Sequence, residues 1–347
     1  MADASRDMLA ATSTPYFAAN QIAMSPHTVS TTTNELVNEY ADVIKGKTIL
    51  TTGVALNSLG GTFIQETASK SPGLLILAGR SASKLEEFAE ALAKEHPNVK
   101  TRNLVVDLGS LASVRKAAEE VNNWEDVPRI DVVVNNAGVM ALPYSKSADG
   151  FELQFAICHL GHFLLTNLIM DKILASESPR VVNISSSGHS LGPIRFADPH
   201  FSNGETYNEW AAYGQAKTAN VLFSVSLAQK LGSRGLQSYS VHPGLILTTG
   251  LGTHLDFASM DADLGAFIQA HRERGNSEGW NFITPVPVEV GAATHAFAAF
   301  DPNIKASNGA YLLEARVSDP YVDTIKSWAR DPVEAEKLWR LSEELVD

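Results

Sequence analysis

The sequence predicts an α/β fold, a doubly wound parallel sheet of about seven strands with helices on both faces. From Lys47 onward, short β-branched runs alternate with helical patterns, as in a chain that winds back and forth across a parallel sheet. The predicted strands are nearly continuous apolar runs, which is typical of strands buried on both faces. No Pro/Gly-rich linker interrupts residues 47–315, so we predict a single domain.

The elements follow in order along the chain. The predicted strands are 47–52, 74–79, 103–107, 130–135, 180–185 and 236–242, with a short one over 310–313. Helical patterns lie near 61–70, 83–94, 110–122, 151–175, 209–231 and 287–299. We expect residues 1–45 to form a partly ordered N-terminal extension with a helix near 34–44, residues 46–320 the domain itself, and 321–347 a C-terminal helical tail.

Composition limits the partners and the compartment. The 347 residues are 44% hydrophobic, and 27 Lys and Arg stand against 39 Asp and Glu, a net charge of −12. This balance argues against nucleic acid or an anionic membrane as the main partner. The single cysteine excludes an intramolecular disulfide framework and a multi-thiolate metal site. No apolar run is long enough for a membrane span, and residues 1–7 resemble neither a secretory signal nor a transit peptide, so we expect a cytoplasmic protein.

The first strand runs into a glycine-rich turn and a helix, KTILTTGVALNSLGGTFIQETASK. Glycines let a backbone approach a pyrophosphate, whose charge suits a helix N-terminus. The spacing departs from G-x-G-x-x-G, and an ordinary glycine turn is the alternative. The residues predicted to bind the cofactor here are Gly53, Asn57, Ser58, Leu59 and Gly60.

The second strand ends at Gly79-Arg80, with Lys84 close behind. At this strand tip an acid suits the free 2′-hydroxyl of NAD(H), whereas an arginine suits the 2′-phosphate of NADP(H). The sequence therefore favours NADP(H), the alternative being that Arg80 is an ordinary surface residue.

The next two strand ends carry further candidates. Asp107 and Leu108 close the third strand where the adenine edge is expected, although Asp107 could instead cap the helix beginning near Ser110. Asn136, Ala137 and Gly138 follow the fourth strand beneath the expected cofactor, or form only a turn.

The pentapeptide YGQAK places Tyr213 and Lys217 four residues apart in a helical run. That spacing puts both on one helix face, where an ammonium group favours the phenolate form of a tyrosine. The alternative is an exposed helix with a surface tyrosine and a solvated lysine.

Together these motifs resemble the short-chain dehydrogenases/reductases, which have a Rossmann-like fold. TTGVALNSLGG, Asp107-Leu108, NNAG, NISSSGH, YGQAK and HPGLILT occur in the order of that family, from about Lys47 to Leu313. LAGRSASKLEEF, GFELQFAICHLGHFLLTNLI and LWRLSEELV resemble the retinol dehydrogenase-like subgroup and its soluble fungal relatives.

The resemblance implies roles. Among the serines of ISSS, Ser186 matches the residue that polarises the substrate carbonyl, Tyr213 the general acid/base, and Lys217 the residue that holds the nicotinamide ribose. Pro243, Gly244 and Thr248 match the loop that contacts the nicotinamide carboxamide. We expect His242, which precedes them, to bind no metal. The long interval from Ser186 to Tyr213 implies an inserted loop around 193–209.

Cys158 departs from the family pattern. The family has a catalytic asparagine in Asn-His-x-Gly, and this chain has Cys-His-Leu-Gly. In the family the asparagine main-chain carbonyl holds a water in a proton relay to the lysine. A carbonyl survives side-chain replacement, although a thiol is the poorer hydrogen-bonding group, and Cys158 could also be an inert buried thiol.

Residues 250–285 fall where the family has its variable substrate lid. Met260, Leu264, Phe267 and Ile268 have helical spacing, with Phe257, Trp280 and Phe282 nearby, which suits a mostly apolar substrate or a helix core.

We therefore predict an NADP(H)-dependent, ketoreductase-like oxidoreductase, for instance of secondary metabolism. The alternatives are a non-catalytic NADP(H)-binding regulator and an epimerase or dehydratase. The family forms dimer faces from helices like 151–175 and 209–231, which implies a homodimer or homotetramer.

Overall fold

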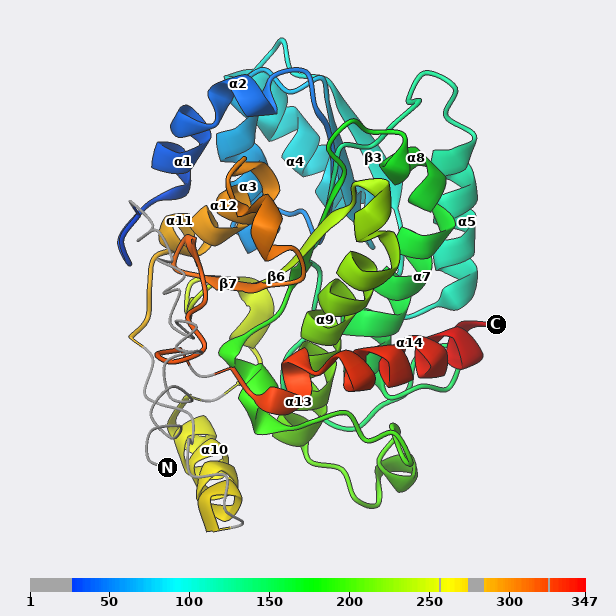
Figure 1. Cartoon of the computed structure of the whole chain (residues 1–347), viewed down its shortest axis with the longest axis vertical. Coiled ribbons are helices and arrows are strands. Elements are labelled where there is room, and N and C mark those ends of the chain that lie inside the picture. Colours follow the sequence, from blue (N-terminus) through cyan, green and yellow to red (C-terminus); the bar gives the residue numbers. More distant parts are fainter. Residues whose placement is uncertain (1–26, 256, 274–283, 324) are drawn as a thin grey trace, which may run out of the picture.

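The computed structural model describes residues 27–255, 257–273, 284–323 and 325–347. Its centre is one sheet in the order β3-β2-β1-β4-β5-β6-β7-β8, parallel except for the β7–β8 pair (Figure 1). The eighth strand is a two-residue addition to the seven expected. The strands are β1 Thr48–Thr52, β2 Leu74–Gly79, β3 Thr101–Val105, β4 Val132–Asn135, β5 Arg180–Ile184, β6 Gln237–His242, β7 Tyr311–Leu313 and β8 Arg316–Val317.

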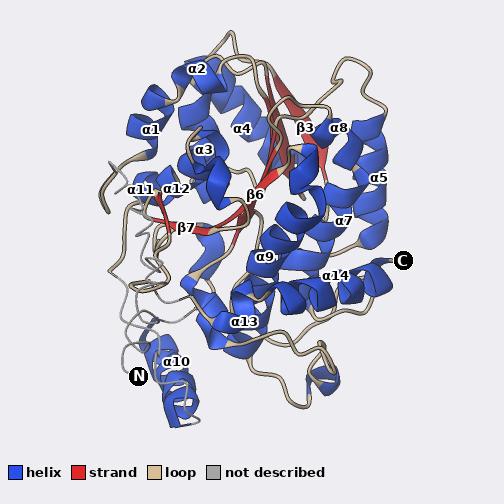
Figure 2. Cartoon of the chain, viewed as in Figure 1, coloured by secondary structure: helices blue, strands red, loops and turns tan. Residues whose placement is uncertain are grey.

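Helices connect the strands and cover both faces of the sheet (Figure 2). The helices before β5 are α1 Thr33–Glu39, α2 Ala41–Ile44, α3 Leu59–Ala68, α4 Ala82–Glu95, α5 Leu111–Asn122, α6 Leu153–Phe155, α7 Gly161–Leu168 and α8 Met170–Leu174. Those that follow are α9 Glu209–Leu231, α10 Phe257–Glu273, α11 Val288–Gly291, α12 Ala293–Phe300, α13 Ser327–Arg330 and α14 Pro332–Val346.

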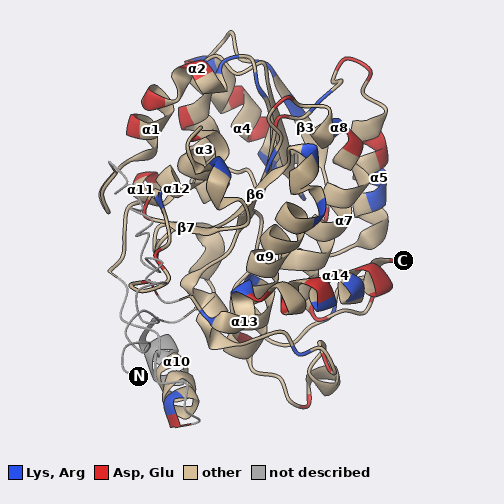
Figure 3. Ribbon diagram, in the orientation of Figure 1, with Lys and Arg blue, Asp and Glu red and all other residues tan. Residues whose placement is uncertain are grey.

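The core has two layers, one on each face of the sheet. Successive strand residues alternate between them, so that Leu50 packs with α5, α7 and α9 while its neighbour Ile49 packs with α1, α3, α4 and α12. Both side chains are completely buried. Figure 3 shows α7 and α12 free of charged residues, whereas α5 and α14 carry theirs toward the outside. The single-domain doubly wound fold is as predicted.

The C-terminal helix α14 packs on α9 and on the 151–175 region. Trp339 makes ring contacts with Phe163 and Phe223, and Ser226 Oγ donates to the Ala335 carbonyl at 2.9 Å. The two helical regions expected to form dimer faces thus contact the chain's own C-terminal helix. The oligomeric state stays a prediction.

Several elements differ from the sequence prediction: the helices expected near 34–44 and 287–299 are each divided into two, and the fourth strand begins at Val132. The third strand lies two residues earlier, because pairing with β2 runs from Leu75↔Thr101 to Gly79↔Val105. The 151–175 pattern is interrupted by a π-helical turn, Ala156–Leu160, immediately before Gly161. A Cβ at Gly161 would lie only 2.5 Å from the Leu108 carbonyl oxygen, so this helix packs against backbone there. The expected tail helix is two helices, because Asp331-Pro332 begins a new one.

Candidate active site

The predicted site residues gather at the carboxyl edge of the sheet, around the switch point between β1 and β4. There β1 has β2 on one side and β4 on the other, and ligands of doubly wound sheets bind in the crevice outside such a point. The loops after these strands touch, since a Cβ at Gly53 would lie 2.8 Å from the Ala137 Cα.

The glycine-rich turn is held by one hydroxyl. Gly53 has φ +73°, a conformation that favours glycine, and Asn57 has φ +56°. Ser58 caps α3, its Oγ accepting the backbone N–H groups of Ala55 at 3.1 Å and Gly61 at 3.0 Å. Ser58 therefore shapes the turn, and the remaining first-turn amides of α3 are the groups placed for an anion.

Two cations follow β2. Arg80 and Lys84 are exposed, and neither forms an ion pair within the described part of the chain. The intervening Ser81 caps α4 by accepting the Lys84 N–H at 3.4 Å. This strand tip thus offers two positive charges.

Asp107 does not cap the following helix, because Ser110 does so by accepting the Ser113 N–H at 3.3 Å. The Asp107 carboxylate accepts the Gly109 N–H at 2.9 Å and shapes the turn instead. The neighbouring Leu108 is buried in the core. The capping alternative was wrong, and contact of Asp107 with an adenine edge stays a prediction.

The loop after β4 is pinned to β1. Thr52 Oγ1 accepts the N–H groups of Asn136 and Ala137, both at 2.9 Å, and Asn136 Nδ2 donates to the Thr52 carbonyl at 2.8 Å. These bonds fix the backbone of Asn136 and Ala137, and contact of Asn136, Ala137 and Gly138 with a cofactor stays a prediction.

Helix α9 presents Tyr213 and Lys217 to the same edge. Asn208 caps it by accepting the Trp210 and Ala211 N–H groups at 3.1 and 2.9 Å. Tyr213 and Lys217 are each 4% exposed, and Lys217 Nζ lies 5.6 Å from the centroid of the Tyr213 ring. The alternative of an exposed helix with a solvated lysine was wrong.

Ser186 reaches this pair from the end of β5. Its Oγ accepts the Gly188 N–H at 3.0 Å. A Cβ at Gly188 would lie 2.9 Å from Tyr213 Cδ1 and 3.3 Å from Ser186 Oγ, so the ring and the hydroxyl flank one glycine. Ser185 points elsewhere, donating to the Lys217 carbonyl at 2.7 Å. The structure thus brings Ser186, Tyr213 and Lys217 together.

The loop after β6 borders the same edge. His242 is half-buried and its Nδ1 accepts the Ser187 N–H at 3.2 Å, while desolvation of the ring lowers the His242 pKa to about 3. Gly244 has φ +85°, and a Cβ there would lie 2.8 Å from Val286 Cγ2. Thr248 lies farther along this loop and is exposed. Among the described residues, no group of three or more His, Cys, Asp and Glu could hold a metal ion.

Cys158 lies in the π-helical turn beside this cluster. Its thiol is fully buried, accepts the Val139 N–H at 3.4 Å and donates to the Val139 carbonyl at 3.5 Å. Burial raises the pKa of the thiol. A Cβ at Gly138 would lie 3.4 Å from both Cys158 Sγ and Lys217 Nζ, so Cys158 and Lys217 approach the same glycine.

Helix α10 packs beside Tyr213. Leu264 is 8% exposed and packs with Tyr213, Leu191, Trp210 and Ala141, with Phe267 and Ile268 beside it. The expected apolar stripe therefore faces Tyr213 and lies apart from the two main core layers. The side chains of Phe257 and Met260, and the residues Trp280 and Phe282, lie outside the described part of the chain.

Thr52, His162 and His295 join these parts, and none of them is among the residues that the sequence predicts for the site. His162 stands four residues after Cys158, a spacing that puts both on one helix face and could have drawn attention to it. Thr52 ends the first strand directly before Gly53. His295, from α12, lies 3.3 Å from Asn136 Oδ1, a contact that no spacing indicates.

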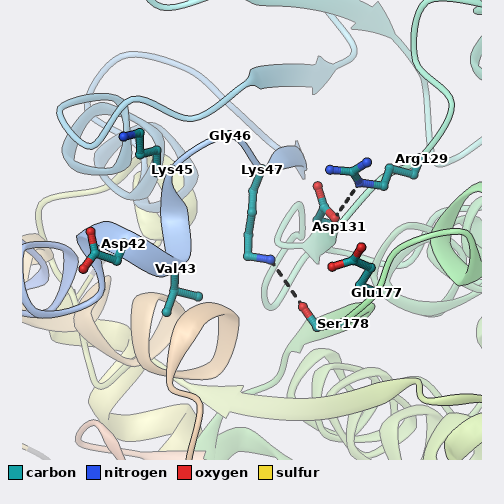
Figure 4. Close-up of a pocket in the computed structure, with 9 residues that line it drawn as sticks. All are labelled: Asp42, Val43, Lys45, Gly46, Lys47, Arg129, Asp131, Glu177 and Ser178. Atoms are coloured by element: carbon teal, nitrogen blue, oxygen red, sulfur yellow. Dashed lines mark hydrogen bonds and ion pairs between the residues drawn. The ribbon is translucent and has the colours of Figure 1, made fainter.

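A pocket of about 310 Å³ opens at the opposite edge of the sheet (Figure 4). Lys47 Nζ donates to Ser178 Oγ at 3.3 Å and Arg129 pairs with Asp131 at 3.2 Å. The pocket contains none of the predicted site residues. Its lining holds positive and negative side chains in equal number, namely Lys45, Lys47 and Arg129 and Asp42, Asp131 and Glu177.

Comparison with known proteins agrees with this geometry. A family model described as short chain dehydrogenase matches residues 47–198. Retinol dehydrogenase 14 of Mus musculus is 34% identical over 314 residues, which are 88% of this chain and 87% of that protein. Short-chain dehydrogenase/reductase prx1 of Penicillium rubens is 34% identical over 322 residues, 89% of this chain and 88% of that protein.

Solved structures give the same fold. An uncharacterised protein from Mycobacterium paratuberculosis superposes with a TM-score of 0.62 at 29% identity, over 88% of this chain and 96% of that one. The NADPH-bound carbonyl reductase from chicken fatty liver has a TM-score of 0.55 at 18% identity, over 79% of this chain and 99% of that one.

The fold and site define a dinucleotide-binding oxidoreductase that acts on an alcohol or carbonyl group. The chain belongs to the short-chain dehydrogenase/reductase family, and its relatives are of the retinol dehydrogenase-like kind. Members of this family bind a nicotinamide cofactor and act on small molecules. No helix in the described ranges has the length and apolarity needed to cross a bilayer. The cytoplasmic location stays a prediction.

Proposed function

We propose that this protein is an NADP(H)-dependent, ketoreductase-like enzyme that interconverts a mostly apolar ketone or aldehyde and its alcohol. The observation that carries the proposal is that Ser186, Tyr213 and Lys217 surround one volume, next to the apolar stripe headed by Leu264. Relatives that are named retinol dehydrogenases support an apolar substrate.

The residues at the switch point fit a dinucleotide. The first-turn amides of α3 suit its pyrophosphate, and the exposed Arg80 and Lys84 suit a 2′-phosphate. The pinned loop after β4 and the loop after β6 border the place for the nicotinamide. The set we assign to the cofactor is Gly53, Asn57, Ser58, Leu59, Gly60, Arg80, Lys84, Asp107, Leu108, Asn136, Ala137, Gly138, Tyr213, Lys217, Pro243, Gly244 and Thr248.

When bound, the nicotinamide supplies or accepts the hydride. Ser186 and Tyr213 donate hydrogen bonds to the carbonyl oxygen, where negative charge develops. In the reductive direction Tyr213 gives up its hydroxyl proton to that oxygen, and Lys217 stabilises the phenolate. Lys217 is oriented for this by its bond to the Ile184 carbonyl, 3.1 Å from Nζ. Because all three side chains start in place, little reorganisation accompanies the reaction.

Replacing Tyr213 by Phe tests the assignment. We expect kcat to fall by about 10²–10⁴-fold for a panel of apolar aldehydes and ketones, because the proton donor is lost. The dissociation constant for NADPH, measured by fluorescence titration, should change less than about twofold.

Tyr239→Phe is the matched control. Tyr239 is buried far from the edge described, and its hydroxyl donates to the Ile304 carbonyl at 2.9 Å. It should lower stability by about 1 kcal/mol and leave kcat unchanged. Wild-type turnover in Tyr213→Phe would refute the proposal, and NADPH binding without turnover in the wild type would favour the regulatory binder. A redox-neutral product would favour the epimerase or dehydratase.

A further inference from the structure

One imidazole bridges the helix that carries Cys158 and the strand that precedes the glycine-rich turn. His162 Nε2 lies 2.8 Å from Thr52 Oγ1, and Nδ1 lies 3.1 Å from the Cys158 carbonyl oxygen. Thr52 and His162 are 0% and 1% exposed, so water does not compete for either bond.

The bonds around Thr52 decide which ring nitrogen of His162 carries the proton. Thr52 Oγ1 accepts the N–H groups of Asn136 and Ala137, both at 2.9 Å, which occupies its two lone pairs. Its own proton can go to His162 Nε2 at 2.8 Å or to a carbonyl at 3.5 Å, and the shorter bond is the stronger. Nε2 therefore accepts, and Nδ1 carries the proton and donates to the Cys158 carbonyl.

The opposite tautomer is unfavourable at both ends of the ring. It would place a third donor on Thr52 Oγ1 and point the Nδ1 lone pair at the lone pairs of the Cys158 carbonyl. Burial also lowers the pKa of His162 to about 4, so the ring is neutral at physiological pH.

At Thr52, the end of β1, the hydrogen bonds continue through Asn136 to the glycine-rich turn. Asn136 Nδ2 donates to the Thr52 carbonyl at 2.8 Å, which leaves Oδ1 to accept from His295 at 3.3 Å. A Cβ at Gly60 would lie 2.5 Å from Asn136 Nδ2, so the Asn136 amide packs directly against the turn. A shift of Thr52 would therefore move both loops.

At the helix end, the bond fixes the backbone of the π-helical turn. The Cys158 carbonyl stands at the family's relay position, and Gly138 lies between the Cys158 thiol and Lys217 Nζ. Orientation of this carbonyl therefore bears on the proton path to Lys217.

We propose that His162 is a positioning residue with two separable tasks. Its Nδ1–H orients the Cys158 carbonyl beside Lys217, and its Nε2, through Thr52, holds the Asn136–Gly138 backbone where the nicotinamide cofactor binds. The first task rests on the proposed function, whereas the second needs only cofactor binding.

Three substitutions separate the tasks. His162→Gln keeps an acceptor near the position of Nε2 and loses the Nδ1 donor, so kcat should fall about fivefold to tenfold with little change in the NADPH dissociation constant. His162→Asn keeps a donor near Nδ1 and loses the Nε2 acceptor, so the dissociation constant should rise about fivefold to tenfold with kcat retained. His162→Phe should show both effects.

His159→Phe is the matched control, because His159 is buried like His162 but lies in the π-helical turn and faces α14, its Nε2 lying 2.7 Å from Ser342 Oγ. It should lower the melting temperature without moving either constant. Equal losses of kcat and affinity in His162→Gln and His162→Asn, or changes no larger than those of His159→Phe, would overturn the proposal.

The ring proton can be located without any turnover. A two-bond ¹H–¹⁵N spectrum of the wild-type protein should show His162 protonated at Nδ1, and protonation at Nε2 would overturn the proposal even if every variant failed to fold. If no carbonyl compound is turned over, the proposed function fails, while the spectrum and the NADPH affinity of His162→Asn still decide the second task.

Discussion

The edge that carries Ser186, Tyr213 and Lys217 and the α10 segment that covers it are built differently. The three side chains come from β5 and α9, and hydrogen bonds to main-chain groups hold Ser186 and Lys217 in place. In α10, Leu264 makes its apolar contacts with Tyr213 and a few neighbours outside the two core layers. Leu247, Thr248 and Leu251, which lead into α10, are exposed.

This difference indicates which of the two regions tolerates substitution without loss of stability. A substitution in the catalytic edge disturbs strands and helices of the core, so its chemistry and its stability are linked. A substitution in α10 alters the apolar surface against Tyr213 with little effect on the core, so under the proposed function substrate choice can vary while the reaction stays the same.

Lowering the pH should have the largest effect on stability, and it should act through the catalytic edge and the core and not through α10. Five histidines packed around the catalytic edge and core have pKa values lowered by burial to about 3 or 4, from an ordinary value of 6.5, namely His159, His162, His189, His242 and His295. Below pH 6.5 the unfolded chain takes up protons that the folded chain does not, so stability present above that pH is lost as the pH falls toward 4. Denaturant unfolding at pH 7 and pH 5 measures the loss.

A variant that lacks one of these histidines shows how much that residue contributes to the pH dependence of stability. In His159→Phe the loss of unfolding free energy between pH 7 and pH 5 should be about 2 kcal/mol smaller than in the wild type. This is the amount that protonation of one histidine in the unfolded chain contributes over that interval. An unchanged pH dependence in this variant would show that His159 titrates normally in the folded protein.

Ser186→Ala should give the next largest effect. Removing one hydrogen-bond donor to the developing oxyanion should lower kcat by about 10²–10³-fold in steady-state assays. Ser185→Ala, one residue earlier, loses a buried bond to the Lys217 carbonyl, so it should cost about 1 kcal/mol of stability and change kcat far less. Similar kcat values in the two variants would contradict the assignment of the polarising role to Ser186.

Arg80→Ala probes the cofactor end of the same edge. Loss of a charge-assisted bond to a 2′-phosphate should raise the NADPH dissociation constant by about tenfold to a hundredfold and leave that of NADH unchanged. Arg234→Ala, which removes an exposed arginine after α9, should change neither constant. Parallel changes for NADPH and NADH would contradict the assignment of Arg80.

Leu264→Ala should have the smallest effect and bears most directly on α10. We expect KM for an apolar carbonyl compound to rise about fivefold to tenfold, since apolar contact beside Tyr213 is lost, with stability nearly unchanged. Leu227→Ala, in the fully buried core layer on α9, should cost about 2–5 kcal/mol of stability. If Leu264→Ala destabilised the protein as much, α10 would be part of the core.

The sequence by itself determined the alternation of strands and helices, because apolar β-branched runs and helical periodicity are local properties. It also determined Ser186, Tyr213 and Lys217 as candidates, since the last two share one helix face and all three match a family motif. The full length of α9 follows from the same periodicity.

Only the tertiary structure decided which of these groups meet and what holds them. Ser58 and Asp107 prove to shape their own turns, and the π-helical turn at Cys158 arises where the helix packs on the Leu108 backbone. The bonds from His162 to Thr52 and from His295 to Asn136 span 110 and 159 residues, and no local pattern encodes contacts between elements so far apart in the chain.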